Sequence, residues 1–260
     1  MMSLLSLKSQ NEVLFWFGLV NLIAAMLMLG LSWLKPLEFA GVNAWFKPIK
    51  FALSTTILSW TMMVFTSYLP QGRDISIFNW VLVITLGFEV IYIALQASRG
   101  QASHFNLSTP FYSAMYSLMA MAASVATLAV GYIGVQFFLN SFPDLPPAYV
   151  WAIRLGIILF VIFSFEGFVM GSRMTHTVGG ADGSPGLPFL NWSLTYGDLR
   201  VAHFIGMHAL QVLPLLAWYL LKDVRLTVGA FVLYACLAVL ILLQALRGNS
   251  VASTISSTLS

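Results

Sequence analysis

Charged side chains are scarce in this sequence. Asp, Glu, Lys and Arg together make up 8% of the 260 residues, whereas hydrophobic residues make up 59%. A soluble domain carries about 25% charged residues, because water must wet its surface. The mean hydropathy of +0.88 is high for the same reason. We therefore predict an integral membrane protein whose main partner is the lipid bilayer.

Cysteine and net charge are also nearly absent. The single cysteine, Cys236, excludes a disulfide within the chain. The formal net charge is only +3, and the basic residues are scattered rather than clustered. A nucleic-acid-binding surface needs a concentrated basic patch, so we expect no nucleic-acid partner.

Long apolar runs are what the sequence has instead. A helix needs about 20 apolar residues to cross a bilayer, and seven runs are long enough. They cover residues 13–34, 49–69, 75–97, 110–139, 149–171, 201–221 and 226–246. The runs are continuously apolar, whereas the strands of a membrane barrel alternate. We predict an all-α fold, a polytopic membrane bundle of seven transmembrane helices that forms one membrane domain over residues 1–260.

Local signals mark several helix ends. Thr109 followed by Pro110 is typical of a helix start, and Asp198 suits the N-cap of the sixth helix. Pro214 should disturb that helix, because proline removes a backbone hydrogen bond. Gly100 and Gly248 stand where a helix end favours a left-handed residue.

The distribution of Lys and Arg predicts the orientation. If the loops alternate across the membrane, seven of the twelve basic residues fall on one side and five on the other. Basic residues are enriched in cytoplasmic loops. We therefore expect a multi-pass protein of the cell membrane, with the N-terminus outside and the C-terminus in the cytoplasm.

One short sequence occurs twice. Residues 95–100 read LQASRG and residues 243–248 read LQALRG, so five of six positions are identical. A diverged parallel three-helix repeat, joined by the fourth helix, would explain this likeness. Two unrelated helix ends that favour Arg and Gly would explain it as well. A weaker sequence similarity is that between Lys47, Lys50 and Phe51 in the second helix and Arg200, His203 and Phe204 in the sixth.

Three ionisable groups lie deep within predicted helices. Glu89 and Glu166 each stand seven residues before the polar end of their helix, and His208 stands eight residues beyond Arg200. All three are therefore about 10 Å from a helix end, on the same side of the membrane. A charge inside a bilayer is costly and often marks a functional site. We predict Glu89, Glu166 and His208 as catalytic residues, and helix-to-helix hydrogen bonds are the alternative.

A cofactor site would draw on the same face of the membrane. The candidate metal or haem ligands are His104, His203 and His208, although His203 and His208 are five residues apart and would need ligands from other helices. Haem b or a transition metal would fit such a set. The residues predicted to bind the cofactor or its acidic groups are Arg99, Arg247, Gln96 and Gln244.

Three classes of function remain open at this point. The first is a haem- or metal-dependent membrane enzyme or redox protein, an oxidoreductase exchanging electrons with quinone. The second is a transporter or channel for protons or small anions, in which the two buried glutamates titrate. The third is an assembly or scaffold protein whose polar residues only join helices.

Overall fold

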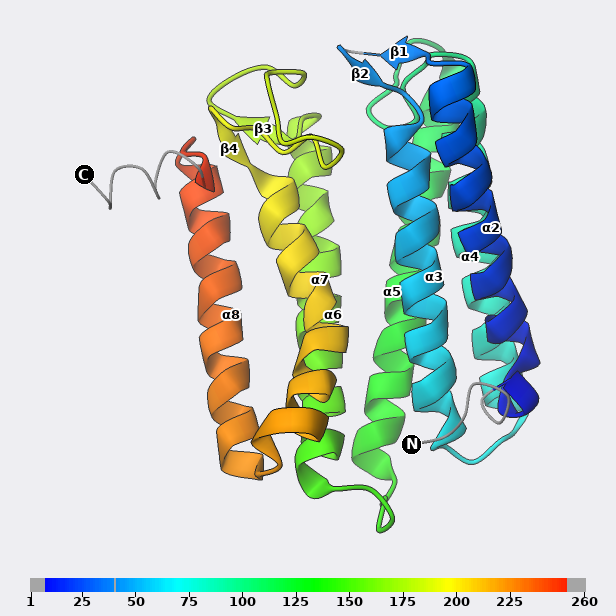
Figure 1. Cartoon of the computed structure of the whole chain (residues 1–260), viewed down its shortest axis with the longest axis vertical. Coiled ribbons are helices and arrows are strands. Elements are labelled where there is room, and N and C mark those ends of the chain that lie inside the picture. The colour runs from blue at the N-terminus through cyan, green and yellow to red at the C-terminus, as the bar shows by residue number, and fades with distance from the viewer. Residues whose placement is uncertain (1–7, 40, 252–260) are drawn as a thin grey trace. The chain divides into compact units, whose positions relative to one another are not determined.

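Seven long apolar helices account for most of the structure (Figure 1). A computed structural model describes residues 8–39 and 41–251, and within them seven helices are long and apolar enough to cross a membrane. They are α2 (Glu12–Leu34), α3 (Phe46–Ser67), α4 (Arg73–Ser98), α5 (Pro110–Leu139), α6 (Pro147–Arg173), α7 (Leu199–Leu216) with its π-helical continuation η1 (Ala217–Leu221), and α8 (Val224–Leu246). The protein is an all-α, multi-pass membrane protein, as predicted.

The chain divides into two compact units, residues 1–133 and residues 134–260, and α5 runs from the first into the second. Each unit contains a helix, a two-stranded antiparallel hairpin and two further helices. The first hairpin pairs β1 (Glu38–Phe39) with β2 (Val42–Asn43) between α2 and α3; the second pairs β3 (Thr177–Val178) with β4 (Gly197–Asp198) between α6 and α7. The single membrane domain expected from the sequence stays a prediction.

Close packing and buried amides hold the first unit together. Gly18 of α2 lies directly against the indole of Trp60 of α3, where a Cβ atom would come within 2.4 Å of Nε1. Near the start of α2, Asn11 donates to Thr66 Oγ1 at 3.0 Å and exchanges hydrogen bonds with Asn79. These three residues belong to the α2, α3 and α4 segments. Buried amides in an apolar bundle need such partners, so this network fixes how the three helices meet.

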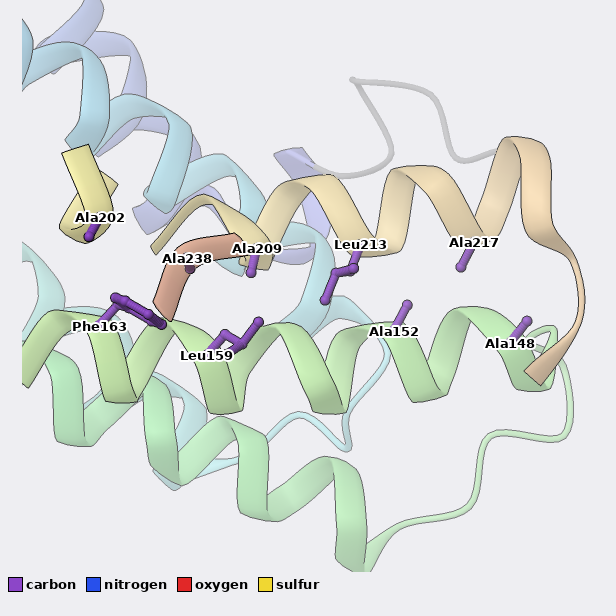
Figure 2. Packing of buried hydrophobic residues seen from close by; sticks show 9 residues of the cluster. All are labelled: Ala148, Ala152, Leu159, Phe163, Ala202, Ala209, Leu213, Ala217 and Ala238. Atoms are coloured by element: carbon purple, nitrogen blue, oxygen red, sulfur yellow. The ribbon is translucent and has the colours of Figure 1, made fainter. Parts of the chain in front are cut away.

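Small side chains let α6 and α7 approach closely in the second unit (Figure 2). Gly156 of α6 packs on the backbone of α7, and a Cβ atom there would lie 2.9 Å from the carbonyl oxygen of Ala209. Figure 2 shows alanines of both helices turned toward the seam between them. The buried cluster at this seam consists of Ala148, Ala152, Leu159, Phe163, Ala202, Ala209, Leu213, Ala217 and Ala238. In a membrane, this kind of packing replaces the hydrophobic effect as the main force between helices.

The predicted helix signals are confirmed. The Thr109 hydroxyl accepts from the Tyr112 amide at 3.2 Å, and Asp198 caps α7 by accepting from the Arg200 amide at 3.1 Å. Pro214 lies inside α7, and the helix widens into the π-helical turn η1 three residues later. Proline cannot donate the backbone bond that an α-helix needs, and π-helical turns are a common local adjustment.

The two copies of the repeated sequence form the same helix end. Gly100 closes α4 with φ +62°, and Gly248 follows α8 with φ +83°. In both, the glutamine side chain donates to the carbonyl oxygen six residues further on, at 3.0 Å from Gln96 and 2.8 Å from Gln244. The two copies therefore have the same structure, and the residues that they share form the helix cap.

Candidate functional site

Glu166 and His203 face each other across the seam between α6 and α7. The distance from Glu166 Oε2 to His203 Nδ1 is 3.3 Å. Glu166 is 7% exposed, and within the described part of the chain neither of its carboxylate oxygens nor His203 Nδ1 has a hydrogen-bond partner. A buried carboxylate that is left without hydrogen bonds is costly. We call these two residues the Glu166–His203 pair.

Glycines next to the pair explain why the two side chains can meet. A Cβ atom at Gly167 would lie 3.3 Å from His203 Cε1, so the imidazole rests against a position without a side chain. One turn along α7, Gly206 packs on the side chain of Phe163, which is one turn before Glu166 on α6. The two contacts set the spacing of α6 and α7 at the level of the pair.

His208 has other partners. Its Nδ1 is hydrogen-bonded to Gln211 Oε1 at 3.1 Å, and its ring lies 4.2 Å from the ring of Phe204. The sequence places His208 at about the same depth in the membrane as Glu166. The imidazole that lies next to Glu166 in the second unit is nevertheless that of His203. Depth along a helix does not define the direction in which a side chain points, and that direction decided the pairing.

Glu89 lies on a polar face of α4 in the first unit. Glu89, Tyr92 and Gln96 are all buried, and Lys47 of α3 is near enough for its charge to act on Glu89. The Tyr92 hydroxyl and Gln96 Oε1 have no hydrogen-bond partner among the described residues. His104 is hydrogen-bonded to Ser103 at 3.1 Å and lies beside aromatic rings of the same unit. The first unit thus has its own buried acidic group with a nearby base.

The glutamines predicted to bind a cofactor have a structural role in the caps. The amide nitrogens of Gln96 and Gln244 are both occupied by backbone carbonyls. Arg99 and Arg247 are the C-cap residues of α4 and α8, and they belong to different units. Their predicted role in holding an anionic group stays a prediction.

No cluster of three or more His, Cys, Asp or Glu side chains with metal-binding geometry occurs among residues 8–39 and 41–251. The proposed ligand role of His104, His203 and His208 remains a prediction.

The long loop between β3 and β4 contains contacts that the sequence analysis did not foresee. The Asp182 carboxylate is 2.9 Å from His176 Nδ1 and also accepts from Thr175 and Thr177. Burial alone would raise the pKa of Asp182, but the hydrogen bonds from His176 and Thr175 outweigh it and hold that pKa below its ordinary value. The strand β4 that follows this loop meets the end of α8, where the Gly197 amide donates to the Gly248 carbonyl at 2.9 Å.

Comparison of the chain with protein-family models, with curated proteins and with solved structures found no match. The site is therefore interpreted from its own chemistry.

Proposed function

We propose that the protein transfers protons within the membrane through the Glu166–His203 pair, as a proton-conducting or proton-coupled transporter of a small anion. The observation that carries the proposal is a buried carboxylate that accepts no hydrogen bond from any described residue and faces an imidazole at 3.3 Å. Carboxyl and imidazole groups are the side chains that most often pass protons to one another in proteins.

The proton would move between Glu166 Oε2 and His203 Nδ1. A shift of a few tenths of an ångström brings the two atoms into hydrogen-bond range. The pair then has two forms, a neutral acid beside a neutral imidazole and a carboxylate beside an imidazolium, which differ only in the position of one proton. The His203 side chain is 28% exposed and that of Glu166 is 5% exposed, so we assign to the imidazole the exchange of protons with the surroundings.

The first unit supports the same chemistry in a second place. Glu89 is buried, and the nearby base is Lys47, in the first turn of α3. In the second unit the base is His203, in the first turns of α7. A buried acid within one helix and a base near the start of the middle helix thus occur in both units. The basic residues at these helix ends would attract an anion that accompanies the proton.

Proton flux into proteoliposomes tests the proposal. The purified chain is reconstituted with a pH-sensitive dye inside the vesicles, and a potassium diffusion potential drives the flux. We expect flux above that of empty vesicles, and we expect Glu166→Gln and His203→Gln each to lower it at least about a hundredfold, the lower end of what a positioned acid or base contributes. Glu12→Gln, which changes an exposed carboxylate at the start of α2, is the matched control and should leave the flux intact.

A second measurement covers a transporter that moves protons only with its substrate. Infrared difference spectra between acidic and basic pH should contain a carboxyl band that disappears in Glu166→Gln and shifts in His203→Gln. Absence of both the flux and the Glu166 band would reject the proposal and leave the pair as a contact between helices.

A further inference from the structure

A second polar site lies at the other end of α6, in the turn that joins it to α5. A cavity of about 370 Å³ is present there, and Arg154 is one of its lining residues. Arg154 stands about two turns into α6. The remaining lining residues come from the α5–α6 turn and the first two turns of α6. The site belongs entirely to the second unit and is separate from the Glu166–His203 pair.

The Arg154 side chain is fixed in place by its neighbours. Its Nε donates to the Phe137 carbonyl oxygen at 2.9 Å, which caps the end of α5. The guanidinium carbon lies 5.1 Å from the ring centroid of Phe138 and 5.1 Å from that of Trp151. Two aromatic faces and one carbonyl therefore hold the guanidinium in a single orientation.

The positive charge of Arg154 has no counter-ion in the described part of the chain. No described carboxylate forms a salt bridge with Arg154, and its two terminal nitrogens make no hydrogen bond to a described residue. Asp144 lies in the same turn, but it is exposed and is not part of the cavity lining. The hydroxyl of Ser141 also lines the cavity and has no described partner. Two guanidinium donors and one hydroxyl are thus available to a ligand.

We propose that this cavity binds a phosphate group, either the headgroup phosphate of a phospholipid or free phosphate, through the terminal nitrogens of Arg154. An arginine whose fork is already oriented binds phosphate with two parallel hydrogen bonds. The volume suits a small ligand. The apolar remainder of the lining, including Val150 and Trp151, suits the start of an acyl chain. Trp151 near a helix end is also typical of the membrane interface, where lipid phosphates lie.

Binding of defined lipids to the purified full-length protein tests this proposal. Native mass spectrometry would give dissociation constants for phosphatidic acid and for diacylglycerol with the same acyl chains. We expect the wild-type chain to bind phosphatidic acid about ten- to a hundredfold more tightly, the range for hydrogen bonds to a charged group. Arg154→Gln should remove most of this preference, and Arg154→Lys should keep part of it, because lysine retains the charge but not the fork.

Arg225→Gln is the matched control, because Arg225 is an exposed arginine near the start of α8, at the same end of the unit. It should leave the preference unchanged. Competition with inorganic phosphate separates the two sources: displacement of phosphatidic acid at millimolar phosphate indicates a free-phosphate site, and no displacement indicates a headgroup site. The proposal fails if wild-type protein binds both lipids equally, or if Arg154→Gln and Arg225→Gln have the same effect. If Arg154→Gln does not fold, the comparison of Arg154→Lys with Arg225→Gln decides instead: an equal preference in these two variants rejects the site.

Discussion

Adding one methyl group at Gly206 should disturb both the stability of the second unit and its buried acid–base pair. A Cβ atom at this position would lie 1.9 Å from Phe163 Cγ and 2.4 Å from Phe163 Cβ. Carbon atoms in ordinary contact are about 3.5–4.0 Å apart. Rotation of the ring cannot relieve the overlap, because the Cβ atom of Phe163 is itself too close. The helices α6 and α7 must therefore move apart.

The magnitude follows from two opposing effects. Overpacking a buried contact costs about 1–3 kcal/mol, and Phe163 is 2% exposed. Alanine in place of glycine favours a helix by about 1 kcal/mol. We expect Gly206→Ala to lower the free energy of unfolding by up to about 2 kcal/mol. Gly229→Ala is the matched control in α8, since a Cβ atom there would meet no atom within 4 Å, and it should be neutral or stabilising by up to about 1 kcal/mol.

Unfolding of the purified protein by sodium dodecyl sulfate in mixed micelles measures both variants. The infrared carboxyl band of Glu166 provides a second readout, because Gly206 lies one turn from His203. We expect Gly206→Ala to shift that band and Gly229→Ala to leave it in place. If Gly206→Ala is as stable as Gly229→Ala and the band is unchanged, the packing of α6 on α7 does not set the geometry of the pair.

Three further predictions concern other parts of the chain. A reporter fused after Ser260 should be active in the cytoplasm, and activity only outside would reverse the predicted orientation. If His203 helps to hold haem b or a transition metal, purified protein should have a Soret band or a stoichiometric metal that His203→Ala removes; a colourless, metal-free preparation that still conducts protons would reject the redox function. The lowered pKa of Asp182 means that its contacts stabilise the loop above the ordinary carboxyl pKa of about 4 and are lost as the pH falls through the lower folded value. Asp182→Asn should therefore speed hydrogen exchange of the Thr177 amide at neutral pH, whereas Asp144→Asn should not, and equal exchange in both variants would refute the role of this carboxylate.

The helices could be predicted from sequence because an apolar run of sufficient length has few alternatives in a bilayer. The fourth helix begins and ends as expected, at Pro110 and Leu139. Others extend two or three residues further, as α3 does by starting at Phe46. The extension takes in Lys47, whose long side chain can reach past the apolar layer. Hydropathy marks the apolar layer, and helices continue beyond it.

The pairing of Glu166 with His203 could not be predicted in the same way. It depends on the rotation of α6 against α7, which is set by glycine contacts between residues far apart in sequence. The depth of a residue can be counted along one helix, but its neighbour belongs to another. The same reason applies to the hairpin of β3 and β4, whose strands are separated by a loop of irregular structure. The sequence contains both Asp182 and His176, but it does not indicate their contact. The fold of the loop brings these two side chains together.

The helix α5, which runs from the first unit into the second, has a consequence for the direction in which the chain crosses the membrane. Each crossing reverses the direction of the chain, so three crossings leave it on the opposite side from its start. A second three-helix unit that followed immediately would be inserted upside down. If each of the seven helices spans the membrane, the crossing by α5 is the one that gives α4 and α8 the same predicted direction. Excising α5 alone would invert every later loop, whereas moving α5 together with either unit would preserve the direction of the rest.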